Sequence, residues 1–365
     1  MFEQLPLWIN LLLFTVAAVA VWIAGTRVAH WADAIARKTG LGQAAAGLLL
    51  LAGVTSLPEI AVTITAAVGG NPQLAVNNLL GSVALQVAIL AVADAVIGKD
   101  ALTAVLPDPV VLMQIALNML ILGVVAAAVV VGDHGFWGVG VWSLGLLGLY
   151  LASVWILTRT PGRLGWVAGY PGGMGSDDGS ATRQRAQGQG SDEPATELQQ
   201  KQQYEIERLS LPALVLRTTA GAVVILVAGF VLARCGEVIA TQTGLGQSMG
   251  GFLLVAISTS LPEASTVIAS VRLGRYVMAV SGIFGTNLFN GGMLFVVDAF
   301  YRGGPVLNEV GPFAAFAALL GLTVSALFLI GLLERRDRSV LRMGYDSFAV
   351  LLVYLGGVVV LFRLQ

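Results

Sequence analysis

The stretch AGVTSLPEIAV, residues 52–62, places a proline and a glutamate inside an otherwise apolar run. The chain repeats this arrangement 204 residues later as AISTSLPEAST, residues 256–266. A proline breaks an α-helix, because it lacks an N–H group and its ring clashes with the carbonyl four residues back. A buried charge is costly unless it is paired. Because the chain carries both unfavourable features twice, we expect them to have a function.

The composition is that of a membrane protein. Of 365 residues, 56% are hydrophobic and only 11% are charged, with a mean hydropathy of +0.83, whereas soluble domains carry about 25% charged residues. The net charge of −1 gives no electrostatic basis for binding nucleic acid. The single Cys235 and two histidines exclude a disulfide framework and Cys- or His-rich metal sites. No nucleophile–base constellation or phosphate loop is found, so we expect neither an enzyme nor a cofactor.

Ten segments are long and apolar enough to cross a bilayer, which takes about 20 residues. They are 6–25, 42–68, 74–97, 103–131, 136–158, 211–233, 246–271, 276–300, 310–333 and 344–362. The one long polar stretch between them is rich in Gly, Ser and Gln, which predicts a largely disordered linker at 159–210. We therefore expect an all-α polytopic membrane protein.

The distribution of basic residues predicts the orientation. With the N-terminus outside, 17 of the 20 lysines and arginines fall on inward-facing segments, as the positive-inside rule requires. Both termini are then outside and the linker is cytoplasmic.

The chain contains an internal repeat. Residues 40–95 align without gaps over residues 244–299 with 22 identities in 56 positions, several of them at Gly, Gln, Thr, Pro, Glu and Asp. An odd number of spans separates the two copies, so they enter the membrane in opposite directions. We predict two inverted five-helix repeats, 1–158 and 211–365, which is the architecture of secondary transporters.

The T-S-L-P-E motif predicts a broken helix with a charge at mid-membrane. Pro58 and Pro262 should free backbone carbonyls in spans two and seven, and such breaks persist only where they line a cavity or bind something. Glu59 and Glu263 alone among the 21 acidic residues lie clearly mid-span, where an ionisable group is functional by default. Carboxylate, hydroxyl and carbonyl oxygens are the ligands of hard cations such as Ca²⁺. The alternative is a simple capping box at each motif.

The next span of each repeat adds polar groups, in NNLLGSVALQ (77–86) and SGIFGTNLFN (281–290). Ser82 and Thr286 supply hydroxyls, and Gln86 and Asn290 supply amide oxygens one turn further on the same face. Their alternative role is to join neighbouring helices by hydrogen bonds.

These motifs resemble the alpha-repeats of the cation/calcium exchanger superfamily, and most closely its sodium/calcium exchanger branch. The resemblance covers the whole ten-span layout and implies an antiporter for inorganic cations that moves Ca²⁺ one way and usually Na⁺ the other. It implies that Glu59 and Glu263 are the central carboxylates. It further implies cation ligands at Thr55, Thr259, Ala52, Ala256, Ser82 and Thr286.

The chain departs from the family pattern at several positions. Val83 and Gln86 replace two asparagines of the third-span motif, and Asn290 stands where some relatives carry an aspartate. The linker is too short for the Ca²⁺-sensing domains of animal exchangers, which indicates a compact prokaryotic form in the inner membrane. Asp94 and Asp298 also match across the repeat, and we favour a structural or ion-access role over a coordinating one.

The resulting prediction is a secondary antiporter exchanging Ca²⁺ for Na⁺ by alternating access, with spans one and six sliding over the repeat core. Two alternatives stay open. One is Ca²⁺/H⁺ or other cation/H⁺ exchange on the same fold, because buried carboxyl groups can carry protons. The other is a non-transporting membrane cation sensor. Sequence gives no indication of protein partners.

Overall fold

The computed structural model describes residues 2–97, 102, 108–159, 206, 208–244, 254–334, 339–340 and 343–364, and the chain is almost entirely helical there. The helices of the first repeat are α1 (Leu7–Thr39), α2 (Gln43–Ala45), the π-helix η2 (Ala46–Leu51), α3 (Ala52–Thr55), α4 (Leu57–Val68), α5 (Pro72–Ile97), α6 (Pro109–Val131) and α7 (Val141–Arg159). Those of the second are α10 (Leu211–Gln242), α12 (Ala256–Thr259), α13 (Leu261–Arg272), α14 (Tyr276–Phe300), α15 (Gly311–Glu334) and α16 (Tyr345–Leu364). Two short hairpins, β1 (Gly135–Phe136) with β2 (Val139–Gly140) and β3 (Ser339–Val340) with β4 (Met343–Gly344), precede α7 and α16.

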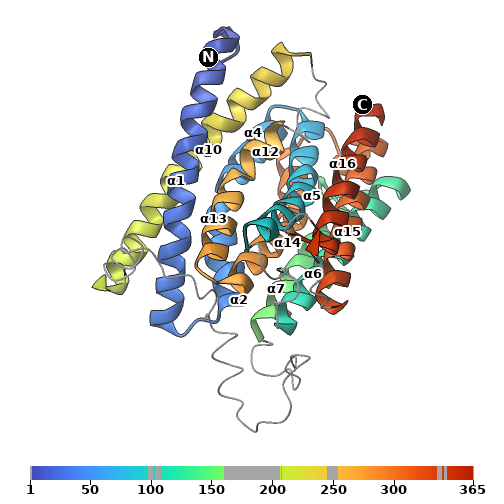
Figure 1. Ribbon diagram of the computed structural model, residues 1–365. Coiled ribbons are helices and arrows are strands. Elements are labelled where there is room, and N and C mark those ends of the chain that lie inside the picture. The colour runs from blue at the N-terminus through green and yellow to red at the C-terminus, as the bar shows by residue number, and fades with distance from the viewer. Residues whose placement is uncertain are drawn as a thin grey trace.

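The described residues contain eight continuous helices that could cross a membrane and one bent pair, Gln43–Thr55 with Leu57–Val68, whose axes differ by 46°. Helices α12 and α13 correspond to the predicted seventh span, of which residues 246–253 are outside the described part. The two termini lie at the same end of the helix bundle (Figure 1), as an even number of spans requires.

Two helices are longer than predicted. The first and sixth spans were expected to end near residues 25 and 233, but α1 continues to Thr39 and α10 to Gln242. A helix of 33 residues is about 50 Å long, which exceeds a hydrocarbon core of about 30 Å. Hydropathy alone ended these spans at their first charged turns, where the helix in fact continues. The predicted linker falls almost wholly on residues outside the described part.

The helices form three groups. Helices α5 and α14 are the most deeply buried and lie at the centre beside α4 and α13. Helices α6, α7, α15 and α16 cover one side, while α1 and α10 pack against each other on the opposite side (Figure 1). The apolar outer faces of α1, α7 and α16 are exposed, as expected of surfaces that face lipid. The paired helices α1 and α10 therefore form a unit beside the central helices.

Two buried aspartates show the repeat symmetry in atomic detail. Asp94, near the end of α5, accepts hydrogen bonds from the Leu102 N–H and, at 2.7 Å, from the Gly344 N–H. Asp298, near the end of α14, accepts from the Val306 N–H at 2.7 Å and the Gly140 N–H at 2.6 Å. The equivalent partners Leu102 and Val306 are 204 residues apart, and so are Gly140 and Gly344. Each aspartate thus anchors the loop after its own helix and the hairpin of the other repeat, which is a structural role.

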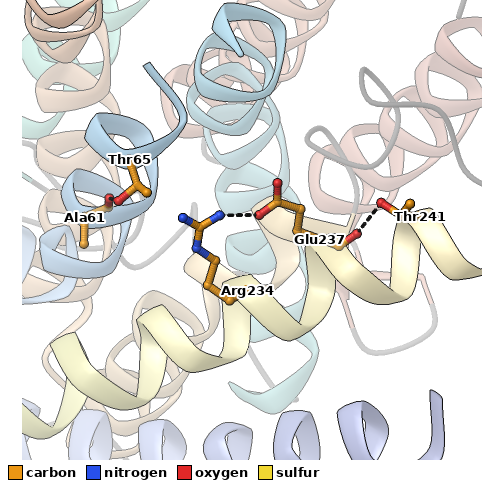
Figure 2. Close-up of polar contacts among 5 residues, drawn as sticks. All are labelled: Ala61, Thr65, Arg234, Glu237 and Thr241. Atoms are coloured by element: carbon orange, nitrogen blue, oxygen red, sulfur yellow. Dashed lines mark hydrogen bonds and ion pairs between the residues drawn. The ribbon is translucent and has the colours of Figure 1, made fainter. Parts of the chain in front are cut away.

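Helices α1 and α10 differ in how their charged ends are held. On α1, the buried Asp33 carboxylate pairs with Arg275 at the start of α14, at 2.7 Å, and with Arg37, at 2.9 Å. Residue 237 occupies the equivalent place on α10, and there Glu237 pairs with Arg234 of the same helix at 2.7 Å (Figure 2). The charged end of α1 is therefore tied to the central helices by an ion pair, whereas the ion pair on α10 is local.

Candidate functional site

The two T-S-L-P-E motifs lie at helix breaks. In the first repeat α3 ends and α4 begins around Ser56, and in the second α12 and α13 meet at Ser260. Glu59 and Glu263 stand in the first turns of α4 and α13, with exposed fractions of 0% and 2%. The N-terminal ends of these two half-helices, where the helix dipole is positive, therefore carry the two carboxyl groups.

The breaks are not simple capping boxes. Ser56 and Ser260 occupy the N-cap positions, but neither makes a side-chain hydrogen bond to the helix it starts. The Ser56 hydroxyl instead donates to the Ala52 carbonyl at 2.7 Å, one turn back. The π-helix η2 leads directly into the first break, and π-helical turns are frequent at functional sites.

The carboxylates are incompletely satisfied. Glu59 Oε1 accepts a hydrogen bond from Gln86 Nε2 at 3.3 Å. Within the described residues, Glu59 Oε2 and both oxygens of Glu263 have no hydrogen-bond partner. The two acids are close enough for their charges to repel, and Thr55 faces Glu263. Burying such oxygens without partners is costly, so the arrangement suits a bound cation.

Hydroxyl and amide groups surround the carboxylates. Ser82 Oγ lies 3.3 Å from Thr259 Oγ1, which joins the two repeats across the site. Ser82 and Asn290 also face the Glu59 carboxylate. In the described part of the chain, Gln86 Oε1, Thr286 Oγ1 and both polar atoms of Asn290 lack hydrogen-bond partners. Several predicted ligands therefore present unpaired oxygen atoms inside the protein.

The two predicted carbonyl ligands, unlike these side chains, already accept hydrogen bonds. The Ala52 carbonyl accepts from the Ser56 N–H at 3.0 Å as well as from the Ser56 hydroxyl. The Ala256 carbonyl accepts from the Ser260 N–H at 2.9 Å, and Thr259 Oγ1 lies 3.3 Å from it. The expectation that the breaks leave these two carbonyls free is thus wrong, because each already accepts a backbone N–H bond. Each would bind a cation through its second lone pair.

One residue of the cluster was not predicted. Asn78 on α5 is fully buried and accepts a hydrogen bond from Thr259 Oγ1 at 3.1 Å. Helical spacing places Asn78, Ser82 and Gln86 on one face of α5, since they are four residues apart. That polar stripe was visible in the sequence and could have identified Asn78.

The ligand set contains few charged groups. No group of three or more His, Cys, Asp or Glu side chains that could hold a metal ion occurs among the described residues. Two carboxylates supplemented by hydroxyls and amides resemble an oxygen-rich site for hard cations rather than a Cys- or His-based centre.

Comparison with known proteins agrees with this geometry. The family profile described as sodium/calcium exchanger protein matches residues 9–159 and 214–363. The Inner membrane protein YrbG of Escherichia coli (strain K12) is 28% identical over 284 residues, covering 76% of this chain and 75% of that protein.

Solved structures show the same fold. The sodium-calcium exchanger NCX_Mj soaked with 100 mM Na⁺ and 10 mM Sr²⁺ superposes with a TM-score of 0.64 at 18% identity, covering 97% of this chain and 99% of that one. The same exchanger soaked with zero Na⁺ and Ca²⁺ gives a TM-score of 0.62 at 18% identity, with coverage of 98% and 100%. The family match spans both repeats and includes both broken helices. The chain belongs to the sodium/calcium exchanger family, whose members are membrane transporters of inorganic cations.

Proposed function

We propose that this protein is a secondary antiporter that exchanges Ca²⁺ for Na⁺ across the membrane by alternating access. The observation that carries the proposal is that Glu59 and Glu263, one from each repeat, are buried at two breaks joined by Gln86, with three carboxylate oxygens lacking partners in the described structure. A buried pair of like charges needs a counter-charge. In a family of cation exchangers, the transported ions are that counter-charge.

The charge of the site explains why transport would be coupled. Two carboxylates give a charge of −2, which one Ca²⁺ or two Na⁺ neutralise. Either load makes the site electrically neutral and able to pass through an occluded state. The empty site keeps two buried, unpaired charges, so its passage is costly. Exchange is thereby favoured over one-way leak.

The proposed ligands come from both repeats. Glu59 and Glu263 supply carboxylate oxygens, and Gln86 and Asn290 supply amide oxygens. Hydroxyls and backbone carbonyls complete the set, from Thr55, Thr259, Ser82, Thr286, Ala52 and Ala256. The donated hydrogen bond from Gln86 leaves Glu59 with one free oxygen, so Glu263 is the better bidentate ligand.

The paired helices α1 and α10 are the proposed moving unit. They pack on each other, and they contact the broken helices through α13 and α4. Sliding of this pair would open the site to one side and then the other. We further propose that both termini are outside, that the linker at 159–210 is cytoplasmic, and that the protein lies in a prokaryotic inner membrane. The basic residues and the similarity to an inner membrane protein support this orientation and location.

A second candidate is exchange of a cation for protons. It is favoured by Gln86 and Asn290, because amides at these places leave only two carboxylates near the centre, and two protons neutralise them as well as two Na⁺ do.

The decisive experiment is ⁴⁵Ca²⁺ uptake into proteoliposomes with a Na⁺ gradient or a pH gradient imposed separately. Uptake driven by Na⁺ alone supports the first candidate, and uptake driven by the pH gradient alone supports the second. Glu59→Gln and Glu263→Gln are each expected to abolish exchange in protein that remains folded, because the site then loses half its charge. Flux like that of the unchanged protein in either variant would disprove the assignment of the site.

A further inference from the structure

Asn78 touches the candidate site through another residue. It lies on α5, is fully buried, and accepts a hydrogen bond from Thr259 Oγ1 of the opposite repeat at 3.1 Å. We propose that Asn78 is a positioning residue that orients the Thr259 hydroxyl so that its lone pairs face the transported cation. This inference rests on the proposed function, because it assigns Thr259 to the cation site.

The argument begins with the hydrogen-bonding capacity of a hydroxyl group, which has one proton and two lone pairs. Thr259 Oγ1 has three oxygen neighbours: Asn78 Oδ1 at 3.1 Å, the Ala256 carbonyl at 3.3 Å and Ser82 Oγ at 3.3 Å. The amide and carbonyl oxygens can only accept. The single proton therefore goes to one of these two, and Asn78 is the nearer. Ser82 and a cation are left facing lone pairs, and lone pairs are what a hard cation binds.

In the first repeat, the equivalent threonine hydroxyl is oriented by a different hydrogen bond. The Thr55 hydroxyl donates to the Leu51 carbonyl of its own segment at 2.9 Å. The position equivalent to Asn78 in the second repeat is Gly282, which has no side chain. A Cβ atom on Gly47 would lie 2.7 Å from the Gly282 nitrogen, so the two backbones are in direct contact there. Gly282 offers Thr55 no side-chain acceptor, and a Cβ atom there would lie 3.6 Å from Leu51 Cβ, which is ordinary van der Waals contact.

The two threonines are therefore oriented unequally. Thr55 depends on its own helix, whereas Thr259 depends on a side chain from the other repeat. Truncating Asn78 removes the nearer acceptor, and the Thr259 proton then turns to the Ala256 carbonyl at 3.3 Å, which is itself a proposed cation ligand. Because that carbonyl oxygen would then be shared between the hydroxyl proton and the cation, cation binding is expected to weaken while the conformational cycle continues.

The test is a double-mutant cycle on the full chain in proteoliposomes, with Asn78→Ala, Thr259→Val and the combined variant. Asn78→Ala is expected to raise the half-saturating Ca²⁺ concentration about 5- to 10-fold, the value of one hydrogen bond, with a smaller change in maximal rate. In the combined variant the increase should not exceed that of Thr259→Val alone, because Asn78 acts through Thr259. Asn118→Ala is the matched control: Asn118 is a buried asparagine on α6 that donates to Ser325 on α15 at 3.2 Å, away from these motifs, and the half-saturating concentration should not change.

Thr259→Ser provides a conservative control, since it keeps the hydroxyl group that Asn78 orients, and Asn78→Ala should raise the half-saturating concentration in that background as it does in the unchanged chain. Additive effects of Asn78→Ala and Thr259→Val, or an unchanged half-saturating concentration in Asn78→Ala, would overturn the proposal. Should Asn78→Ala fail to fold, Asn78→Leu decides, because it keeps a side chain of similar size without the acceptor oxygen, and an unchanged half-saturating concentration in that variant counts against the proposal. If Glu59→Gln and Glu263→Gln abolish exchange while the Asn78 and Thr259 effects add, only this inference fails. If both glutamine variants transport normally, the proposed function itself fails.

Discussion

The Asp298→Asn substitution tests whether the Asp298 carboxylate has a structural role or binds the transported cation. Asp298 is fully buried in α14, and its two oxygens accept from the Gly140 N–H at 2.6 Å and the Val306 N–H at 2.7 Å. An asparagine has the same shape but only one acceptor oxygen. Its amide nitrogen would then face a backbone N–H, so that two donors oppose each other inside the protein.

The expected loss of stability follows from these two bonds. One charge-assisted hydrogen bond disappears and a buried donor is left without a partner, which together cost about 3 to 5 kcal/mol. The remaining bond loses its charge and weakens further. Because Asp94 makes the equivalent contacts with Leu102 and Gly344, Asp94→Asn should be destabilising by a similar amount.

The assay is the thermal unfolding midpoint of the detergent-solubilised protein, measured beside Ca²⁺ flux. Both variants should unfold at a lower temperature, while the folded fraction keeps the half-saturating Ca²⁺ concentration of the unchanged protein. A shifted half-saturating concentration with an unchanged midpoint would refute the reasoning, because it would mean that Asp298 binds the ion rather than the hairpin.

Two further predictions concern other charges. Arg275→Gln should lower the unfolding midpoint more than Arg37→Gln, because the Arg275 side chain is 12% exposed and the Arg37 side chain 34% exposed where they pair with Asp33, and a more buried ion pair costs more to break. The control is Arg234→Gln, in a pair with side chains 30% and 32% exposed, whose expected loss of stability is below about 1 kcal/mol. Equal losses of stability in all three variants would contradict the argument. Asn290→Asp should make exchange more strongly dependent on membrane potential, because the site charge changes from −2 to −3 and the site then admits a third monovalent ion. Ca²⁺ uptake at membrane potentials set with valinomycin measures this dependence. A steep potential dependence in the unchanged protein, which carries Asn290, would contradict the prediction.

Much of the fold was predictable because its signals are local. A run of about 20 apolar residues marks a span without reference to any neighbour, and the repeated T-S-L-P-E motif marks the two breaks. The inverted arrangement followed from counting spans between the copies. The end of α1 was not predictable in this way, because Asp33 is stabilised by Arg275 from a distant part of the chain.

The site was predictable in its residue types but not in its hydrogen bonds. Glu59 and Glu263 were identified as mid-span charges, and both are buried at the breaks. That Gln86 would donate to Glu59 depends on how α4 and α5 of the first repeat pack, and that Thr259 would donate to Asn78 depends on which helices of the two repeats lie side by side. The additional hydrogen bond from the Ser56 hydroxyl to the Ala52 carbonyl depends in the same way on the rotamer of Ser56. The ligand roles of these residues remain predictions.

The packing of α1 and α10 suggests how movement could reach the site. A Cβ atom on Gly229 of α10 would lie 2.5 Å from Pro58 Cγ, and one on Gly25 of α1 would overlap Ser265 Oγ and lie 3.2 Å from the Pro262 carbonyl oxygen. The two glycines are 204 residues apart, as are the two prolines. Each proline directly precedes a site carboxylate, Glu59 or Glu263. Each outer helix therefore packs through a glycine against the break of the other repeat, so a displacement of α1 or α10 acts on residues within two positions of a carboxylate. Neutralising the two carboxylates removes their mutual repulsion at the same place, which is why ion binding and helix sliding would be coupled here.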